Sequence, residues 1–174
     1  MSVVKTVIPL TAQLVQYATT LSPQQVISRI EDRINREGSM KFMSSLPSIT
    51  SREELEETIR GVTQGNDFML MQSMRHDNWL KFYDEKTPLV AVYSIGNPMI
   101  AKHLVSSTFD LRAAYNIPPR LLILEKEDRT GTYVLYYLPS SVMSLNGDEG
   151  NFVAAVRALD EKLERLVIEV TKVD

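Results

Sequence analysis

The most regular hydrophobic pattern lies near the end of the 174-residue chain. Its apolar positions recur at alternating steps of four and three residues, opposite a charged face, at Phe152, Val156, Leu159, Leu163, Leu166 and Val170. This spacing predicts one long amphipathic helix over residues 149–172. Packing of this stripe on a sheet is the favoured interpretation. A helix–helix contact between two copies is the alternative, because the same spacing also forms a coiled-coil seam.

The N-terminal part of the chain predicts a strand followed by a helix. Residues 11–21 mix β-branched, aromatic and polar side chains in rough alternation, which is typical of a strand. Ser22 and Gln25 then form the pattern of a capping box around Pro23, a residue that suits the first helical position. Apolar residues follow at helical spacing, and Gly38 is expected to end this helix.

Residues 39–65 are interpreted as an insertion that carries a surface helix. The first part of this segment, residues 39–50, is expected to be irregular. Ser51 and Glu54 form a second capping box, and apolar residues follow at helical spacing.

Further apolar runs predict four more strands, at residues 68–71, 89–95, 121–125 and 132–138. The run at 89–95 is nearly continuous, which favours burial on both faces of that strand. Short helices are expected around residues 76–83 and over residues 98–106, the second with Asn97 as its N-cap. A turn that contains glycine, at residues 128–131, joins the last two runs into an antiparallel hairpin.

Together these elements predict an α+β fold, with a small, mostly antiparallel sheet and helices packed on one face. No repeat, low-complexity tract or Pro/Gly-rich linker interrupts the pattern. Residues 1–174 are therefore expected to form a single domain.

Composition and charge exclude several classes of protein. The chain has no cysteine, which excludes a disulfide framework, a zinc finger and a cysteine nucleophile. It carries 19 basic and 22 acidic residues, for a net charge of −3, which gives no general attraction to nucleic acid or to an anionic membrane. We therefore expect neither nucleic acid nor membrane as a partner.

No motif for a cofactor or a metal is present. The Walker loop, the G-x-G-x-x-G fingerprint and the H-E-x-x-H helix are all absent from the sequence, so no cofactor and no metal site are expected. The N-terminal residues do not form a signal peptide, and no window approaches the roughly 20 apolar residues of a membrane span. The expected location is cytoplasmic.

His76 is the main candidate for a catalytic residue. It is one of two histidines, it precedes Asp77, and it lies close to Trp79 after an apolar run. Imidazole titrates near neutral pH and can act as a general base or as a hydrogen-bond donor to a ligand. The alternative is a histidine that starts a helix, with Asp77 at the positive end of that helix.

Four residues are candidates for binding a ligand. Asn97 ends a strand and starts a helix, where free backbone N–H groups can bind a carboxylate. Tyr93, Tyr136 and Trp79 are candidates to line an apolar pocket, with the tyrosine hydroxyls at its rim. The alternatives are a cap that only terminates the strand, and aromatic residues that serve ordinary packing.

Three segments, in this order and at this spacing, resemble the DUF302 family, whose fold is TT1751-like. They are FMLMQSMRHDNWL at residues 68–80, LVAVYSIGNP at 89–98 and IPPRLLILE at 117–125, followed by Gly131. The resemblance implies an α+β domain that is often dimeric. It implies no reaction, because the family is named for its unknown function.

Three hypotheses from different functional classes follow. The first is a domain that binds a small apolar or carboxylate-bearing molecule, with the polar end of the ligand at Asn97 and His76. The second is a metal-independent enzyme in which His76 is the acid or base and Tyr93 or Tyr136 orients the substrate. The third is an interaction module that forms a homodimer through the stripe at residues 152–170.

Overall fold

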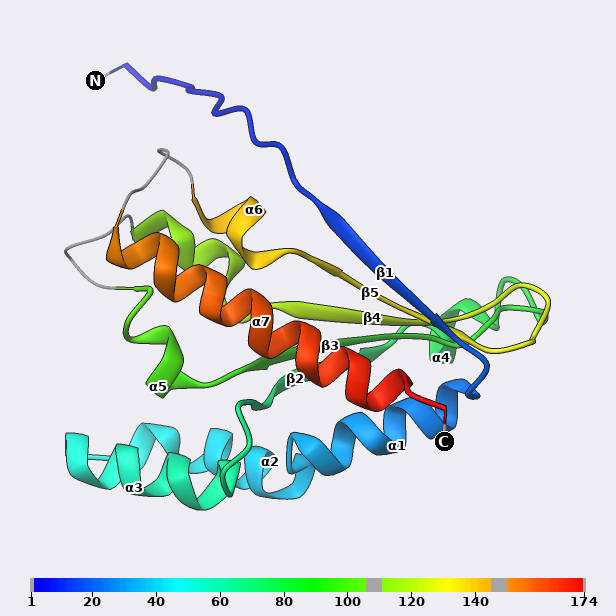
Figure 1. Cartoon of the computed structure of the whole chain (residues 1–174), viewed down its shortest axis with the longest axis horizontal. Coiled ribbons are helices and arrows are strands. Elements are labelled where there is room, and N and C mark those ends of the chain that lie inside the picture. The colour runs from blue at the N-terminus through cyan, green and yellow to red at the C-terminus, as the bar shows by residue number, and fades with distance from the viewer. Residues whose placement is uncertain (1, 106–110, 145–149, 174) are drawn as a thin grey trace.

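The computed structural model describes residues 2–105, 111–144 and 150–173, which form a five-stranded sheet and a layer of helices (Figure 1). The strands are β1 (Leu14–Thr19), β2 (Met69–Arg75), β3 (Val90–Gly96), β4 (Arg120–Glu125) and β5 (Thr132–Tyr137). The helices are α1 (Pro23–Arg33), α2 (Arg36–Ser45), α3 (Arg52–Thr63), α4 (Asp77–Leu80), α5 (Pro98–Ala101), α6 (Pro139–Met143) and α7 (Asn151–Thr171). Two short 3-10 helices are η1 (Leu46–Ser48) and η2 (Leu111–Asn116).

The sheet has the strand order β1-β5-β4-β3-β2, and every neighbouring pair is antiparallel. The predicted α+β fold, with an antiparallel sheet and helices on one face, is confirmed. The first strand is an edge of the sheet, because it pairs only with β5, where Thr19 lies opposite Thr132. The other edge is β2.

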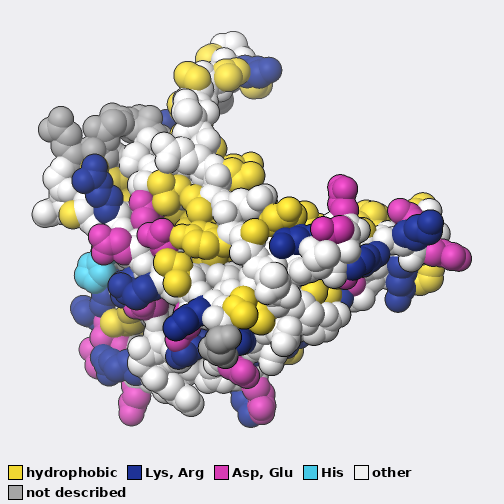
Figure 2. All heavy atoms as spheres, turned by 45° about the vertical axis from the view of Figure 1, so that its right-hand side comes forward, with side chains coloured by type: hydrophobic (Ala, Val, Ile, Leu, Met, Phe, Trp, Pro, Cys, Tyr) yellow, Lys and Arg dark blue, Asp and Glu magenta, His cyan; other side chains and the backbone are white. Residues whose placement is uncertain are grey.

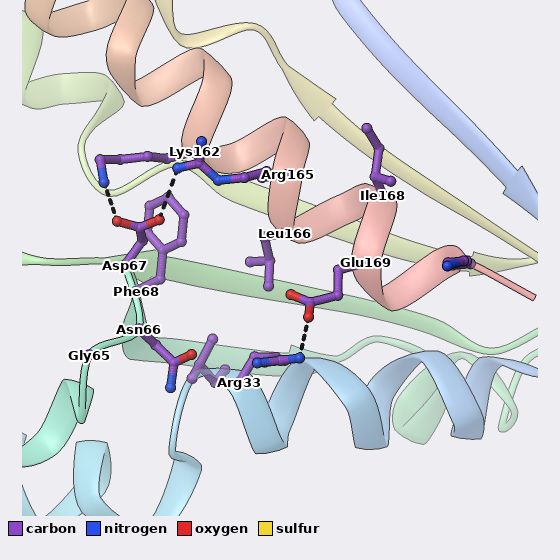
Figure 3. A pocket seen from close by; sticks show the side chains of 12 residues that line it. Arg33, Gly65, Asn66, Asp67, Phe68, Lys162, Arg165, Leu166, Ile168 and Glu169 are labelled. Carbon is purple, nitrogen blue, oxygen red and sulfur yellow. Dashed lines mark hydrogen bonds and ion pairs between the residues drawn. The ribbon is translucent and has the colours of Figure 1, made fainter. Parts of the chain in front are cut away.

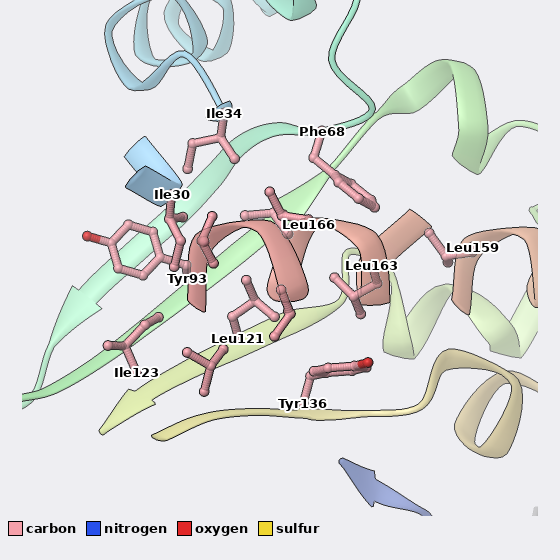
Figure 4. Packing of buried hydrophobic residues seen from close by; sticks show 14 of the residues in the cluster. Ile30, Ile34, Phe68, Tyr93, Leu121, Ile123, Tyr136, Leu159, Leu163 and Leu166 are labelled. Atoms are coloured by element: carbon pink, nitrogen blue, oxygen red, sulfur yellow. The ribbon is translucent and has the colours of Figure 1, made fainter. Parts of the chain in front are cut away.

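The main core lies between the sheet and the helices α1 and α7 (Figure 4). Alternate residues of the strands face this layer, as Ala91, Tyr93 and Ile95 do from β3. The stripe on α7 also faces it, and every one of its six side chains is buried. The stripe packs on the sheet, in agreement with the favoured interpretation, and a homodimer through the stripe stays a prediction that a single chain does not test.

Among the described residues, no helix of the main core packs on the opposite face of the sheet. Val90 and Val92 are half-buried there, while their neighbours along β3 are buried against the helices. The expectation that this strand is buried on both faces is therefore wrong. Its near-continuous apolar run reflects one fully covered face and one partly covered face.

A second, smaller hydrophobic cluster joins α2 and α3 to the edge strand β2. Its buried members are Phe42, Ile59, Val62 and Met69. These two helices fill most of residues 39–65, and the interpretation of that segment as an insertion stays a prediction.

The expectation of irregular structure over residues 39–50 is wrong. Asn35 adopts a left-handed conformation with φ of 44°, and its side-chain oxygen accepts a 3.1 Å hydrogen bond from the N–H of Gly38. This asparagine ends α1 and caps α2 at once, as a short polar side chain can. Gly38 therefore lies in the first turn of a second helix and does not end the region.

Several predicted helix ends agree with the structure. Ser22 and Gln25 form both bonds of the capping box at the start of α1. α4 and α5 are shorter than expected, since α5 ends at Ala101 and residue 106 lies outside the described residues.

Residues 2–13 form an exposed arm that continues the line of β1 and projects from the body (Figures 1 and 2). Its large apolar side chains are exposed, from Val3 at 100% to Leu10 at 46%. Among the described residues, no helix is long and apolar enough to cross a bilayer.

Candidate functional site

A pocket of about 450 Å³ lies between the end of α1, the loop before β2 and the C-terminal half of α7 (Figure 3). Its apolar lining comes from Ile34, Phe68 and Leu166, which belong to the main core, and from the exposed Ile168. The pocket therefore opens directly over the junction of the first and last helices, where core side chains form part of its surface.

Charged side chains surround this apolar lining. The carboxylate of Asp67 binds the ammonium group of Lys162 and, at 3.3 Å, the guanidinium group of Arg165. Across the pocket, Arg33 of α1 pairs with Glu169 of α7. These ion pairs connect α7 both to α1 and to the loop before β2.

The lining holds more cations than carboxylates. Arg33, Lys162, Arg165 and Lys172 contribute four positive charges, while Asp67 and Glu169 contribute two negative ones. The pocket thus has an excess positive charge inside a chain whose net charge is −3. Such an excess beside apolar surface attracts an anion.

Local backbone structure places Asp67 at the pocket. Helix α3 ends at Gln64 in the left-handed region, and Gly65 continues the turn with φ of 86°, a value that glycine adopts without strain. The side-chain amide of Asn97 then donates a 3.1 Å hydrogen bond to the backbone carbonyl of Asp67. The loop is therefore fixed to the end of β3.

The structure places Asn97 differently from the expected anion site. Its side-chain oxygen accepts a 2.9 Å bond from the N–H of Met99, so it caps α5. The apolar cavity beside Asn97 holds only about 20 Å³, too little for a ligand. The role that the structure gives Asn97 is to cap α5 and to support the loop that carries Asp67.

His76 and Asn97 lie at opposite ends of one strand pair. In the antiparallel register, Met69 is opposite Gly96 and Arg75 is opposite Ala91. Since a strand rises about 3.3 Å per residue, the two candidates are separated by roughly 20 Å along the sheet. The structure does not bring them into one pocket.

The surroundings of His76 offer little to a reacting group. Its ring contacts the ring of Trp79 edge-on at 6.1 Å, and Trp79 is 46% exposed. No hydrogen bond to the imidazole is found among the residues that the structure describes. The neighbouring carboxylate of Asp77 is engaged by Arg75 at 2.8 and 2.6 Å.

The pair of Arg75 and Asp77 makes stability depend on pH. Hydrogen bonds from Arg75 lower the pKa of Asp77 in the folded protein. The pair therefore stabilises the fold above a pH of about 3.9, the pKa of aspartate in an unfolded chain, and this stabilisation is lost as the pH falls through the lower pKa of the folded state. We expect Asp77→Asn to lower the free energy of unfolding by about 1–2 kcal/mol at pH 7, and by much less at pH 3. Urea titrations at both pH values measure this difference. An equal loss at both would show that the charge of Asp77 contributes nothing.

The structure brings Tyr93 close to the residues that flank His76. Tyr93 is buried, and its hydroxyl donates a 2.7 Å hydrogen bond to Glu31, which also pairs with Arg36 at 2.7 Å. These residues line a hollow together with Arg75. Burial, followed by the bond to Glu31, raises the pKa of the tyrosine hydroxyl, so it stays protonated.

Tyr136 lies in the core between the sheet and α7 (Figure 4). Burial is the main cause of its raised pKa, and the nearby Tyr17 and Glu164 add to it. Tyr17 itself donates a 2.8 Å hydrogen bond to Glu164 of α7. Tyr136 does not line the pocket beside α7, so packing is the role that the structure gives it.

The residues that line the pocket were not among the sequence candidates. On the polar face of α7, Lys162, Arg165 and Glu169 follow one another at steps of three and four, which places them on one side of the helix, and Lys172 follows directly after its end. That spacing was the one sign of the pocket in the sequence. It does not identify a site by itself, because a charged helix face usually lies in solvent. No cluster of histidine, aspartate and glutamate able to hold a metal ion is found within residues 2–105, 111–144 and 150–173.

Comparison with known proteins supplies the family. The sequence pattern of the domain of unknown function DUF302 matches residues 42–170. No curated protein matches the chain. The crystal structure of an uncharacterized conserved protein DUF302 from Bacillus stearothermophilus is similar, with a TM-score of 0.61 and 12% identity, over 91% of this chain and 98% of that one. At this identity the likeness shows the fold alone. Because the family pattern covers most of the sequence, the chain belongs to the DUF302 family.

Proposed function

We propose that this protein binds a small amphipathic anion, an apolar body that carries a carboxylate, in the pocket between α1 and α7. The observation that carries the proposal is the excess of cations around an apolar lining. A cavity of about 450 Å³ falls within the usual range of roughly 300–1,000 Å³ for small-molecule sites.

The proposal assigns each part of the ligand to a part of the pocket. The apolar body lies against Ile34, Phe68 and Leu166, and the carboxylate faces the cations of α7. Arg165 is more available than Lys162, whose side chain is 30% exposed, because 65% of its own side chain is exposed and its bond to Asp67 is a long 3.3 Å. A guanidinium group also matches a carboxylate with two parallel donors.

A binding function has more support than the alternative of an enzyme that uses His76. The pocket lining contains no histidine, serine, threonine or tyrosine. His76 lies at the far end of β2 from Asp67, beside an exposed tryptophan. Its imidazole therefore has no reach to a ligand held by Arg165.

The test compares octanoate with 1-octanol, two probes that share an apolar chain and differ in charge. We expect octanoate to bind more tightly, and Arg165→Glu to weaken its binding by about fivefold to tenfold through the loss of attraction. Arg157→Glu is the matched control, since Arg157 is an exposed arginine of the same helix that lies outside the pocket lining. Ligand-observed NMR titration measures the affinity of the wild type for both probes and the affinity of each variant for octanoate.

A variant that is expected to strengthen binding separates an effect on binding from an effect on folding. Asp67→Asn removes the carboxylate that competes for Lys162 and Arg165, and it leaves the backbone carbonyl that Asn97 holds. We expect this variant to bind octanoate several-fold more tightly than the wild type. Equal binding of octanoate and octanol, or weaker binding by Asp67→Asn in a folded protein, would contradict the proposal.

A further inference from the structure

The pocket between α1 and α7 has two charged ends (Figure 3). At the first of them, the Asp67 end, Lys162 and Arg165 share the single carboxylate of Asp67. Two positive charges therefore face one negative charge. The Asp67 end has an excess of one positive charge, which matches one carboxylate of a ligand.

The second end, the Glu169 end, has the same balance of charge. Arg33 of α1 pairs with Glu169, and Lys172, three residues further along the chain, adds a second cation to the lining. Arg29 of α1 donates a 2.5 Å hydrogen bond to the backbone carbonyl of Lys172, which fixes this residue beside α1. The excess positive charge of the pocket is thus divided equally between its two ends.

Apolar surface separates the two ends. Leu166 lies between them on α7, and the core residues Ile34 and Phe68 lie beside it in the lining. Lys162 precedes Glu169 by seven residues, which corresponds to a distance of about 10 Å along the helix axis. An unbranched chain of methylene groups can follow this surface from one end to the other.

We propose that the ligand of this pocket is a dicarboxylate, an apolar chain with one carboxylate at each end. The inference rests on the proposed function, anion binding in the same pocket, and extends it to the Glu169 end. A monocarboxylate balances the excess charge at one end only, whereas a dicarboxylate balances it at both. Once the first carboxylate is bound, the second binds within the same complex, so it adds affinity without a second association step.

Octanedioate and octanoate test the inference, because they have equally long carbon chains and differ by one carboxylate. We expect the wild type to bind octanedioate about fivefold more tightly than octanoate or better. Butanedioate is too short to reach both ends at once, so we expect it to gain no more than about twofold over butanoate, the statistical advantage of two equivalent carboxylates. Ligand-observed NMR titration measures the four affinities.

Arg33→Gln tests the Glu169 end. It removes the excess positive charge there, and we expect the ratio of the affinities for octanedioate and octanoate to fall to about two. The side chains of Arg33 and Glu169 are both about half exposed, so loss of their ion pair costs the fold little. Arg157→Gln is the matched control, since Arg157 is an exposed arginine of α7 outside the pocket lining, and it is expected to keep the ratio of the wild type.

The results distinguish failure of this inference from failure of the proposed function. If octanoate binds more tightly than 1-octanol but octanedioate gains twofold or less over octanoate, the dicarboxylate is overturned and the binding of a monocarboxylate stands. The dicarboxylate is also overturned if Arg157→Gln lowers the ratio as much as Arg33→Gln does. If neither octanoate nor octanedioate binds, both proposals are overturned.

Discussion

Leu159→Asp is expected to abolish folding. Leu159 belongs to the stripe of α7 and is 3% exposed, packed in the core between helix and sheet. Removing a buried leucine side chain costs about 2–5 kcal/mol, and burying a carboxylate in its place adds more. The sum is comparable to the total stability of a typical domain, about 5–15 kcal/mol.

Ala158→Asp is the control, because it places the same charge on the exposed face of the same helix, one residue earlier. We expect it to change the free energy of unfolding by less than about 1 kcal/mol. Circular dichroism of both variants during urea unfolding measures the difference. If Leu159→Asp gave a folded monomer from a dimeric wild type, the stripe would be an interface and the position of α7 would be wrong.

Gly131→Ala is expected to lower the free energy of unfolding by about 2–5 kcal/mol. Gly131 precedes β5 with φ of 152°, and a Cβ atom there would lie 2.1 Å from the backbone oxygen of Thr19. A backbone atom cannot rotate aside as a side chain does. The end of β1 must therefore move away from β5, which disturbs the pairing of Thr19 with Thr132.

The matched control for this variant is a glycine-to-alanine change that is expected to raise the stability of the protein. Gly61 lies in α3, and a Cβ atom there meets nothing within 4 Å. We expect Gly61→Ala to stabilise the protein by about 0.5–1 kcal/mol, since glycine is a poor helix former. Thermal unfolding separates the two, with a shift of roughly 2–4 °C for each kcal/mol in a chain of this size. Equal melting temperatures for the two variants would contradict the close approach at Thr19.

The sequence predicted those elements whose signals are local. The capping box at Ser22 depends on side chains three residues apart, and the hairpin of β4 and β5 depends on the one turn that joins them. The amphipathic stripe of α7 is a repeat within one helix. Such patterns are set by neighbouring residues, so the chain shows them without its fold.

Other features depend on residues that are distant in the sequence. The open face of β3 could not be recognised from its own residues, because an apolar run looks alike whether one or both faces are covered. Asn35 caps α2 from a left-handed conformation, which its residue type allows but does not require.

The pocket was missed for the same physical reason. Its lining combines Arg33, Asp67 and Arg165 from three separate segments, which only the packing of α7 on α1 brings together. His76 stands out in the sequence because histidine is rare in this chain. That a residue type is rare in a sequence does not say where its side chain lies in the fold. The fold places His76 away from the pocket.

The place of β1 in the sheet has a consequence for the way this chain is made. The hydroxyl of Thr132 donates a 2.8 Å hydrogen bond to the carbonyl of Leu21, a residue 111 positions earlier, and β5 begins at Thr132. During synthesis, β1 therefore waits for its partner until β5, which begins 111 positions after Leu21, has been translated. Contacts of such long sequence separation slow folding and prolong the exposure of apolar segments. Among the described strands, β1 is the one whose pairing partner lies farthest along the sequence, so it stays exposed longest during folding.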